Sequence, residues 1–300
     1  MSKAQNLFFG ALLQAVVLSC FVACGDDRTS NASREGENGG RGGQSPDSVA
    51  ELGEVWKLDC NEKNKGDTVY VRYEDWKWYC DGKNWWKANL DLNVSPFNPD
   101  ITYGTLKDDR DGHVYRTVKI GSQTWMAENL NYIPDVNDNN SCFKGDSLYC
   151  EVFGRLYSWA SAIGMSEKKC GDGHDCQFDL IQGECPDGWH LPSEAEFDTL
   201  VAFAGGYDVA GAKLKSSHRW RTQDYGTDDF GFSALPAGYR IAWGNGSDSD
   251  YSLGDEAHIW SSTQISISNV FLLQLKSDKT KAYRLSGFKD NPSSVRCIKD

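Results

Sequence analysis

The sequence has little positive charge and few histidines. Its 300 residues include 31 lysines and arginines against 43 aspartates and glutamates, which gives a formal net charge of −12, and only five histidines. An acidic surface repels nucleic acid and anionic lipid. The composition therefore argues against both as partners, and it leaves neutral and cationic ligands open.

Common catalytic signatures are also lacking. The chain contains no G-x-S-x-G, H-E-x-x-H or P-loop sequence, and no two cysteines stand at C-x-x-C spacing. A carboxylate pair of the glycosidase type stays open, because such a pair is defined only by its separation in space. No cofactor motif is present.

No hydrophobic run is long enough for a confident membrane span. The apolar segment at residues 7–23 has the length of a secretory signal. Phe21-Val22-Ala23-Cys24, followed by Gly25, is typical of a bacterial lipoprotein cleavage site. Residues 1–24 are therefore predicted to be a lipoprotein signal peptide with the lipid on Cys24. The alternative is an ordinary signal peptide cut elsewhere, and either one predicts export.

Residues 25–50 are predicted to be a flexible tether. Glycine, serine, asparagine and acidic residues dominate residues 25–46, where no apolar residue is larger than Ala32. Such a segment buries too little surface to offset the entropy of ordering it.

Eight of the ten cysteines follow the signal region. An even number of cysteines in an exported chain favours disulfides over free thiols. Spacing predicts three local pairs and leaves one long-range pair: Cys60 with Cys80, Cys142 with Cys150, Cys170 with Cys176, and Cys185 with Cys297. A zinc site is the alternative, but His174 between Cys170 and Cys176 is alone.

Residues 51–90 are predicted to form a small β module. Strands are expected at 68–73, 75–80 and 85–87, with a turn at Asp81-Gly82. The module contains five tryptophans, among them Trp85 and Trp86. These rings predict either a sugar-stacking face or, as the alternative, core and cross-strand packing.

A linker at 91–102 precedes the main domain at 103–300. Apolar spacing predicts helices around 156–163 and 197–204, and Ser193 with Glu196 forms a capping box at the start of the second helix. Strands are expected at 113–120, 234–243, 258–263, 270–276, 282–288 and 294–298. Helices followed by a run of strands indicate an α+β fold.

Six blocks of the main domain resemble the Fibrobacter succinogenes major paralogous domain: residues 111–132, 154–160, 185–197, 237–240, 259–263 and 294–297. More distantly, residues 191–197 (LPSEAEF) and the closing Arg296-Cys297 resemble the formylglycine-generating-enzyme and C-type-lectin-like superfamily. The first resemblance implies an exported, often lipid-anchored protein of fibre-degrading bacteria. The second implies a mixed α+β fold with long loops.

The second resemblance also raises the question of catalysis. Formylglycine-generating enzymes use a reactive cysteine pair and copper, whereas Cys297 is predicted to be locked in a disulfide and so is no nucleophile. His190 is expected to be a hydrogen-bonded structural residue, and Ser193 is accounted for as a helix cap. We therefore expect that the protein is not an enzyme.

The loop at residues 243–256 is the candidate ligand site. Its oxygen-bearing and aromatic side chains suit calcium or a sugar, although a solvated turn has the same composition: Trp243, Asn245, Asp248, Asp250, Asp255 and Glu256. EF-hand spacing and the Trp-Asn-Asp triplet of calcium-dependent lectins are absent.

The sequence thus predicts a lipid-anchored protein of the cell envelope, displayed at the outer membrane or cell surface. Its predicted role is non-catalytic binding or adhesion, with plant-wall polysaccharide as the expected partner. The alternatives are a structural envelope protein with a protein partner and an enzyme related to formylglycine-generating enzymes.

Overall fold

The structure is a computed structural model. It describes residues 48–50, 52–55, 57–72, 76–80, 82–83, 85–87, 95–134, 140–178, 180–221, 226–242 and 249–300. Cys24, the predicted signal peptide and most of the predicted tether lie outside these ranges. Across the described ranges, no helix has the length and apolar character needed to cross a membrane.

The first sheet of the described chain has four strands in the order β1-β2-β3-β4. It begins at Ser48, inside the predicted tether at 25–50 and before the predicted module at 51–90, because β1 pairs with β2. Its strands are β1 (Ser48–Val49), β2 (Thr68–Val71), β3 (Trp76–Cys80) and β4 (Trp85–Lys87), and a short helix α1 (Leu52–Val55) follows β1. The three strands expected from the sequence are present. Val69, Trp78 and Trp85 are buried in its core.

A five-stranded sheet in the order β10-β17-β7-β6-β5 begins the main domain. It contains β5 (Gly104–Lys107), β6 (Val114–Ile120), β7 (Gln123–Met126), β10 (Trp189–His190) and β17 (Ile298–Lys299). The strand expected at 113–120 is confirmed as β6. The last strand of the chain pairs with β7, so the two ends of the domain meet in this sheet.

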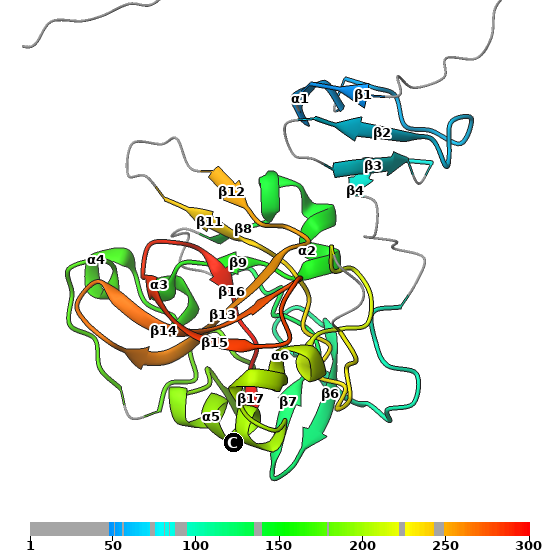
Figure 1. Ribbon diagram of the computed structural model, residues 1–300. Helices are drawn as coiled ribbons and strands as arrows, with labels where there is room; N and C mark the ends of the chain where they lie inside the picture. Colours follow the sequence, from blue (N-terminus) through cyan, green and yellow to red (C-terminus); the bar gives the residue numbers. More distant parts are fainter. Residues whose placement is uncertain are drawn as a thin grey trace, which may run out of the picture. The chain divides into compact units, whose positions relative to one another are not determined.

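The larger sheet has six strands in the order β15-β14-β13-β16-β9-β8. Its long strands β13 (Glu256–Gln264), β14 (Asn269–Lys276) and β15 (Ala282–Phe288) confirm three predicted strands, and Figure 1 shows them side by side. The short strands β16 (Ser293–Ser294), β9 (Leu156–Tyr157) and β8 (Asn140–Ser141) extend the sheet.

The single strand expected at 294–298 is instead two short strands in different sheets. β16 belongs to the six-stranded sheet and β17 to the five-stranded sheet. The chain passes from one sheet to the other at residues 295–297, where Val295, Arg296 and Cys297 are completely buried. This crossing ties the two sheets together at the closing motif.

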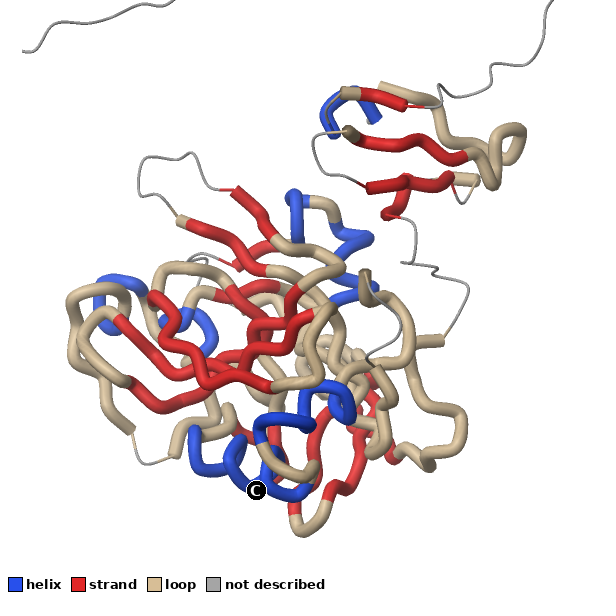
Figure 2. The backbone as a smooth tube through the Cα atoms, viewed as in Figure 1, coloured by secondary structure: helices blue, strands red, loops and turns tan. Residues whose placement is uncertain are grey.

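Helices are short and lie around the sheets, as the blue segments in Figure 2 show. They are η1 (Phe143–Gly145), α2 (Ser147–Phe153), α3 (Trp159–Ala162), α4 (Glu167–Cys170), α5 (Glu194–Phe203) and α6 (Tyr207–Leu214). The capping box of Ser193 and Glu196 is present at the start of α5.

The helix predicted at 156–163 is only partly correct. Leu156 and Tyr157 form β9, which pairs with β16 and β8, and the helix starts at Trp159. The hydroxyl of Ser158 accepts a hydrogen bond from the backbone N–H of Ser161, so Ser158 caps the helix and fixes its start.

The strand predicted at 234–243 is also shorter than expected. Only β11 (Tyr239–Ile241) forms, and it pairs with β12 (Ser249–Tyr251) in a two-stranded ribbon. Gly238 has a positive φ of 67°, and a Cβ there would lie 2.2 Å from the carbonyl oxygen of Tyr251. This glycine therefore turns the chain into the ribbon.

Two apolar clusters cover opposite faces of the long strands. On one face Ile259, Phe271 and Leu273 pack with residues of α5 and α6. On the other face Trp260 and Leu272 pack in a second cluster, which also contains the disulfide cysteines Cys185 and Cys297. The fold is thus mixed α+β and consists mostly of sheet.

All four predicted disulfides are present: Cys60–Cys80, Cys142–Cys150, Cys170–Cys176 and Cys185–Cys297. The last one joins residues 112 apart in sequence. It links the segment before β10 to the segment before β17, two strands that are themselves hydrogen-bonded.

Candidate functional site

Two of the sequence blocks that carry the resemblance, residues 154–160 and 259–263, hydrogen-bond to each other in the core of the main domain. Indole Nε1 of Trp159 donates a hydrogen bond to the carbonyl oxygen of Ser261 at 2.9 Å, and Nε1 of Trp260 donates to the carbonyl oxygen of Tyr157 at 2.8 Å. The two blocks around Trp159 and Trp260 thus lock each other reciprocally. Both indoles are fully buried, so these tryptophans are structural.

His190 is a buried, hydrogen-bonded residue. Its Nδ1 lies 2.7 Å from Oδ1 of Asp300, and its Nε2 lies 2.9 Å from Oε1 of Glu196. The hydrogen bond with Glu196 raises the pKa of His190; burial opposes this shift, and Asp300 adds to it. These contacts join β10 to α5 and to the C-terminal residue, which agrees with the structural role expected for His190.

The described cysteines offer no nucleophile. Every cysteine from Cys60 onward is paired in one of the four disulfides. A cysteine held in a disulfide cannot supply a thiolate.

A polar pocket opens on the six-stranded sheet, on the face that carries Trp260. It encloses about 270 Å³. Its lining comes from β11, β13, β14, β15 and the segment after β15: Tyr239, Glu256, His258, Trp260, Leu272, Gln274, Lys276, Leu285, Ser286, Gly287, Phe288, Asn291 and Ser293. We call this the central pocket.

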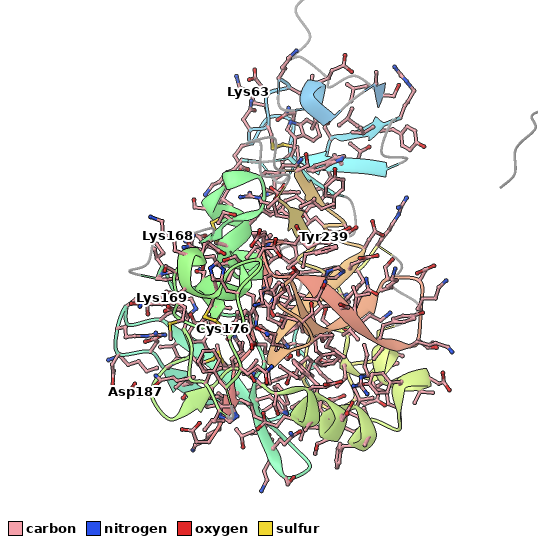
Figure 3. The ribbon with its side chains drawn as sticks, turned by 90° about the vertical axis from the view of Figure 1, so that its left-hand side faces the viewer. Lys63, Lys168, Lys169, Cys176, Asp187 and Tyr239 are labelled. Atoms are coloured by element: carbon pink, nitrogen blue, oxygen red, sulfur yellow. A yellow bond between two sulfur atoms is a disulfide. The ribbon has the colours of Figure 1, made fainter. Side chains whose placement is uncertain are left out.

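An aromatic pair forms one wall of the central pocket. The ring of Tyr239 stacks on the imidazole of His258 with centroids 4.4 Å apart and planes 4° from parallel. The ring of Tyr251 in β12 lies near that of Tyr239, with centroids 6.0 Å apart and planes 28° from parallel. Tyr239 is labelled in Figure 3. The β11–β12 ribbon therefore places an aromatic surface over the polar end of the sheet.

Alternation along β13 and β14 supplies the polar floor. Glu256 and His258 stand two residues apart on β13, opposite Lys276 and Gln274 of β14. Side chains of alternate residues share one face of a sheet. All four therefore line the same surface.

These polar groups form one network around Glu256. Its Oε2 lies 2.8 Å from Nε2 of His258 and accepts a hydrogen bond from Nε2 of Gln274 at 3.1 Å, while its Oε1 lies 3.0 Å from Nζ of Lys276. Burial raises the pKa of Glu256, but the hydrogen bonds from His258 and Lys276 outweigh it and bring the pKa to about 2. The pocket thus contains a permanent carboxylate whose charge is balanced.

Among the described residues of the predicted loop, Glu256 is the one that lines the central pocket. Glu256 lines the pocket, whereas Trp243, Asn245 and Asp248 lie outside the described residues. Asp250 points elsewhere, since it accepts hydrogen bonds from Nε and Nη2 of Arg240 at 2.7 and 3.1 Å.

The three described carboxylates of this loop each face a basic side chain and do not converge on one point. Asp250 pairs with Arg240, Asp255 lies 3.6 Å from Arg221, and Glu256 contacts Lys276. Within the described part of the chain, no group of three His, Cys, Asp or Glu side chains is arranged to hold a metal ion. Calcium binding therefore gains no support from Asp250, Asp255 and Glu256.

Of the two tryptophans predicted to bind a ligand in the small sheet, the structure describes the side chain of Trp85 only. Trp85 is 4% exposed, and its Nε1 donates a hydrogen bond to the carbonyl oxygen of Leu58 at 3.0 Å. Its ring is a core element and not an open stacking face, which corrects its assignment as a ligand residue. The side chain of Trp86 lies outside the described part of the structure.

Sequence reasoning missed most of the central pocket: Tyr239, His258, Gln274, Lys276, Phe288 and Asn291. The detectable signal was the polar alternation at Glu256 and His258, repeated at Gln274 and Lys276, inside strands that are otherwise apolar. Asn291 and Tyr239 gave no such signal, because only the folded chain brings them to the sheet.

A second cavity of about 200 Å³ is lined by residues of the predicted linker, by α2 and by the segment after β7. Phe97, His113, Glu128, Glu151 and Arg219 are among its lining residues. Its mixture of aromatic rings, such as Phe97 and Phe153, with side chains of both charges indicates no particular ligand.

Comparison with known proteins supports the resemblance seen in the sequence. The Fibrobacter succinogenes major domain matches residues 118–299, which is more than half of the chain. Neither a curated protein nor a solved structure matches the chain. The chain therefore belongs to the Fibrobacter succinogenes major domain family.

Proposed function

We propose that this protein binds carbohydrate, without catalysis, at the central pocket. The observation that carries the proposal is the stacked pair of Tyr239 and His258 beside the network of Glu256, Gln274 and Lys276. A sugar ring has apolar faces, which pack on aromatic rings, and hydroxyl groups at its edge, which exchange hydrogen bonds with polar side chains. The central pocket offers both kinds of surface within one hollow.

The cellular setting supports the same role. Family membership suggests a cell-surface protein. The proposed anchor is a lipid on Cys24, which places the protein in the envelope, at the outer membrane. Metabolic labelling with a radioactive fatty acid tests this directly: the wild-type chain is expected to incorporate label, and Cys24→Ser to lose it.

The proposed fold relationship is to the C-type-lectin-like and formylglycine-generating-enzyme superfamily. The disulfide from Cys185 to Cys297, which holds the paired strands β10 and β17, is consistent with it. The absence of an unpaired cysteine among the described residues disfavours the enzymatic branch of that superfamily.

The decisive experiment is a binding assay on the mature, disulfide-bonded chain. Insoluble cellulose, xylan and chitin serve as ligands, each with calcium or with a chelator. Retention that Tyr239→Ala and His258→Ala abolish, and that Phe203→Ala leaves intact, supports the proposal. Phe203 is a suitable control because it is an exposed ring on α5, outside the central pocket.

A structural envelope protein is the second candidate. Ile265 and Ile267, at the tip of the β13–β14 hairpin, are both more than half exposed. Exposed aliphatic side chains of this kind favour a protein contact. Failure to bind any of the glycans, together with co-purification of one fixed partner that Ile267→Asp removes, would favour this candidate.

A further inference from the structure

Lys215 is a completely buried lysine that directly follows helix α6. Its ammonium nitrogen Nζ donates hydrogen bonds to three main-chain carbonyl oxygens, those of Lys276 at 2.8 Å, Lys279 at 2.7 Å and Ser277 at 3.3 Å. These acceptors lie at the end of β14 and in the turn that leads to β15. Because a charged donor makes strong hydrogen bonds and a buried charge needs partners, Lys215 fixes the path of the main chain in this turn.

The main chain around Lys215 is itself held in place. The N–H of Ser216 donates to the carbonyl oxygen of Ala234 at 3.0 Å, and the N–H of Ala234 donates to the carbonyl oxygen of Leu214 at 2.9 Å. These two bonds lie on either side of Lys215 in the chain. The ammonium group also lies 5.2 Å from the ring centroid of Trp220, which is buried. Lys215 therefore reaches the turn from a well-supported position.

The turn that Lys215 holds carries a polar residue of the central pocket. Lys276 lines this pocket, and its own Nζ lies 3.0 Å from Oε1 of Glu256. The turn is also tied to the residue before β13, because the N–H of Ser277 donates to the carbonyl oxygen of Asp255 at 2.7 Å and its hydroxyl donates to Oδ1 of Asp255 at 3.2 Å. A displaced turn would therefore separate Lys276 from Glu256.

From these contacts we propose that Lys215 is a positioning residue of the central pocket, which fixes the turn after β14 and so keeps Lys276 against Glu256. The proposal rests on the proposed carbohydrate binding and adds a residue that acts on the pocket through the main chain. Burial lowers the pKa of Lys215 to about 8, although Asp278 opposes this shift. A buried ammonium group costs stability that an apolar side chain of similar size would not, so filling the core does not explain a lysine here.

Carbon NMR of the Glu256 carboxyl group tests the proposal without any ligand. In the wild type, burial raises the pKa of Glu256, but its partners bring it to about 2. Lys215→Met should raise this pKa by about one unit or more, because Lys276 moves away from the carboxylate. Lys276→Met removes the opposing charge directly and should raise the pKa at least as much.

Lys289→Met is the matched control. Lys289 is also completely buried, and its Nζ donates hydrogen bonds to the carbonyl oxygen of His174 and to Oε1 of Gln264, at the opposite end of β13 from Glu256. This variant should lose stability, as Lys215→Met does, but leave the pKa of Glu256 unchanged. An equal shift in both variants would show that general loosening of the fold moves the pocket, and it would overturn the proposal.

The wild-type chain allows a second measurement that does not depend on any variant folding. The charged groups of the turn are Lys276, Asp278 and Lys279. Raising the pH through about 8 removes the charge of Lys215, and a neutral amine donates weaker hydrogen bonds than an ammonium group. The carbonyl carbon signals of Lys276 and Lys279 should then shift together, and the carboxyl signal of Glu256 should shift with them. A constant Glu256 signal, while both carbonyl signals move, would contradict the proposal.

Calorimetric titration with cellohexaose and xylohexaose separates this proposal from the proposed function. Lys215→Met should weaken binding about fivefold or more, since a lost hydrogen bond to a ligand costs about that factor, whereas Lys289→Met should not change it. Equal affinities of wild type and Lys215→Met would leave carbohydrate binding intact and make the positioning role wrong. If the pKa of Glu256 shifts as expected but neither oligosaccharide binds, the ordering of the turn by Lys215 stands and the proposed function fails.

Discussion

Arg296 donates two hydrogen bonds, at 3.1 and 2.9 Å, to Oδ1 of Asn129, a residue 167 positions earlier in the sequence. The guanidinium is completely buried, also donates to the carbonyl oxygens of Phe232 and Ser233, and lies 4.5 Å from the ring centroid of Phe232. Burial lowers the pKa of Arg296 to about 10. The arginine of the closing Val-Arg-Cys motif is therefore a structural cation that holds the crossing segment at 295–297 to Asn129 and to the segment at Phe232 and Ser233.

The first prediction concerns this pair. Asn129→Ala removes the acceptor of two hydrogen bonds and leaves part of a buried charge unpaired, so it should lower the free energy of unfolding by about 3 kcal/mol or more. Lys107→Ala, which breaks an exposed ion pair with Asp109, should cost less than about 1 kcal/mol. Urea denaturation of both variants measures the difference. Equal losses would mean that the buried network is no more important than a surface contact.

Conserving the charge is not enough at this site. Arg296→Lys keeps a cation but cannot reproduce the planar arrangement of donors that reaches Asn129, Phe232 and Ser233 together. We expect this variant to be destabilised about as much as Asn129→Ala, and the same denaturation experiment compares them.

The second prediction concerns pH and His190. Because its pKa in the folded protein is raised above the unfolded value of about 6.5, its contribution to stability is complete below that pH and is lost as pH rises through the folded pKa. The free energy of unfolding should therefore decline as the pH rises above about 6.5. Burial raises the pKa of Glu196, but its hydrogen bonds with His190 and Ser193 outweigh burial and lower the pKa overall. Glu196 therefore stabilises the fold at neutral pH, and this contribution is lost as the pH falls through its folded pKa.

Two variants check the assignment of this decline. His190→Asn should flatten the dependence of stability on pH above about pH 6.5. Asp300→Asn removes one of the two carboxylates and should reduce the decline without abolishing it, since Glu196 remains. An unchanged slope in His190→Asn would assign the effect to another group.

The third prediction compares two disulfides. In the chain-entropy model the Cys185–Cys297 bond, which closes residues 112 apart, contributes between about 4 and 5 kcal/mol. The Cys170–Cys176 bond, with a separation of 6, contributes only about 2 kcal/mol. Denaturation of the two double Cys→Ala variants gives both values. A larger loss from the shorter loop would contradict the entropic account.

Local signals in the sequence were enough for part of this fold. Ser193 and Glu196 lie three residues apart and cap α5 through contacts within one helical turn, so the sequence alone identifies that start. Three cysteine pairs followed from their spacing, and Cys185 with Cys297 was the pair that remained. Helix α6 was missed because Gly205 and Gly206, both with positive φ, end one helix and lead directly into the next.

Long-range relationships were beyond the reach of sequence patterns. Nothing in residues 294–298 shows that the chain changes sheets there. The contact of Arg296 with Asn129 in this segment joins residues 167 positions apart and forms only in the folded domain. The central pocket also depends on contacts between residues far apart in the sequence. Tyr239 meets His258 through the β11–β12 ribbon, and Phe288 and Asn291 reach the central pocket only after β15 has paired with β14.

The last prediction concerns the carboxylate in the central pocket. Although burial raises its pKa, the partners of Glu256 bring that pKa to about 2, so the side chain stays ionised above roughly pH 3. Binding of neutral oligosaccharides should therefore be independent of Glu256 titration between about pH 4 and 6. Glu256→Gln keeps the shape of the side chain but loses the ion pair with Lys276. This variant should bind more weakly, because Lys276 and His258 lose the carboxylate that holds them in position. Calorimetric affinities across this pH range, for wild type and Glu256→Gln, test both statements. A wild-type affinity that falls steeply between pH 6 and 4 would show that Glu256 takes up a proton there and that its network is weaker than the geometry implies.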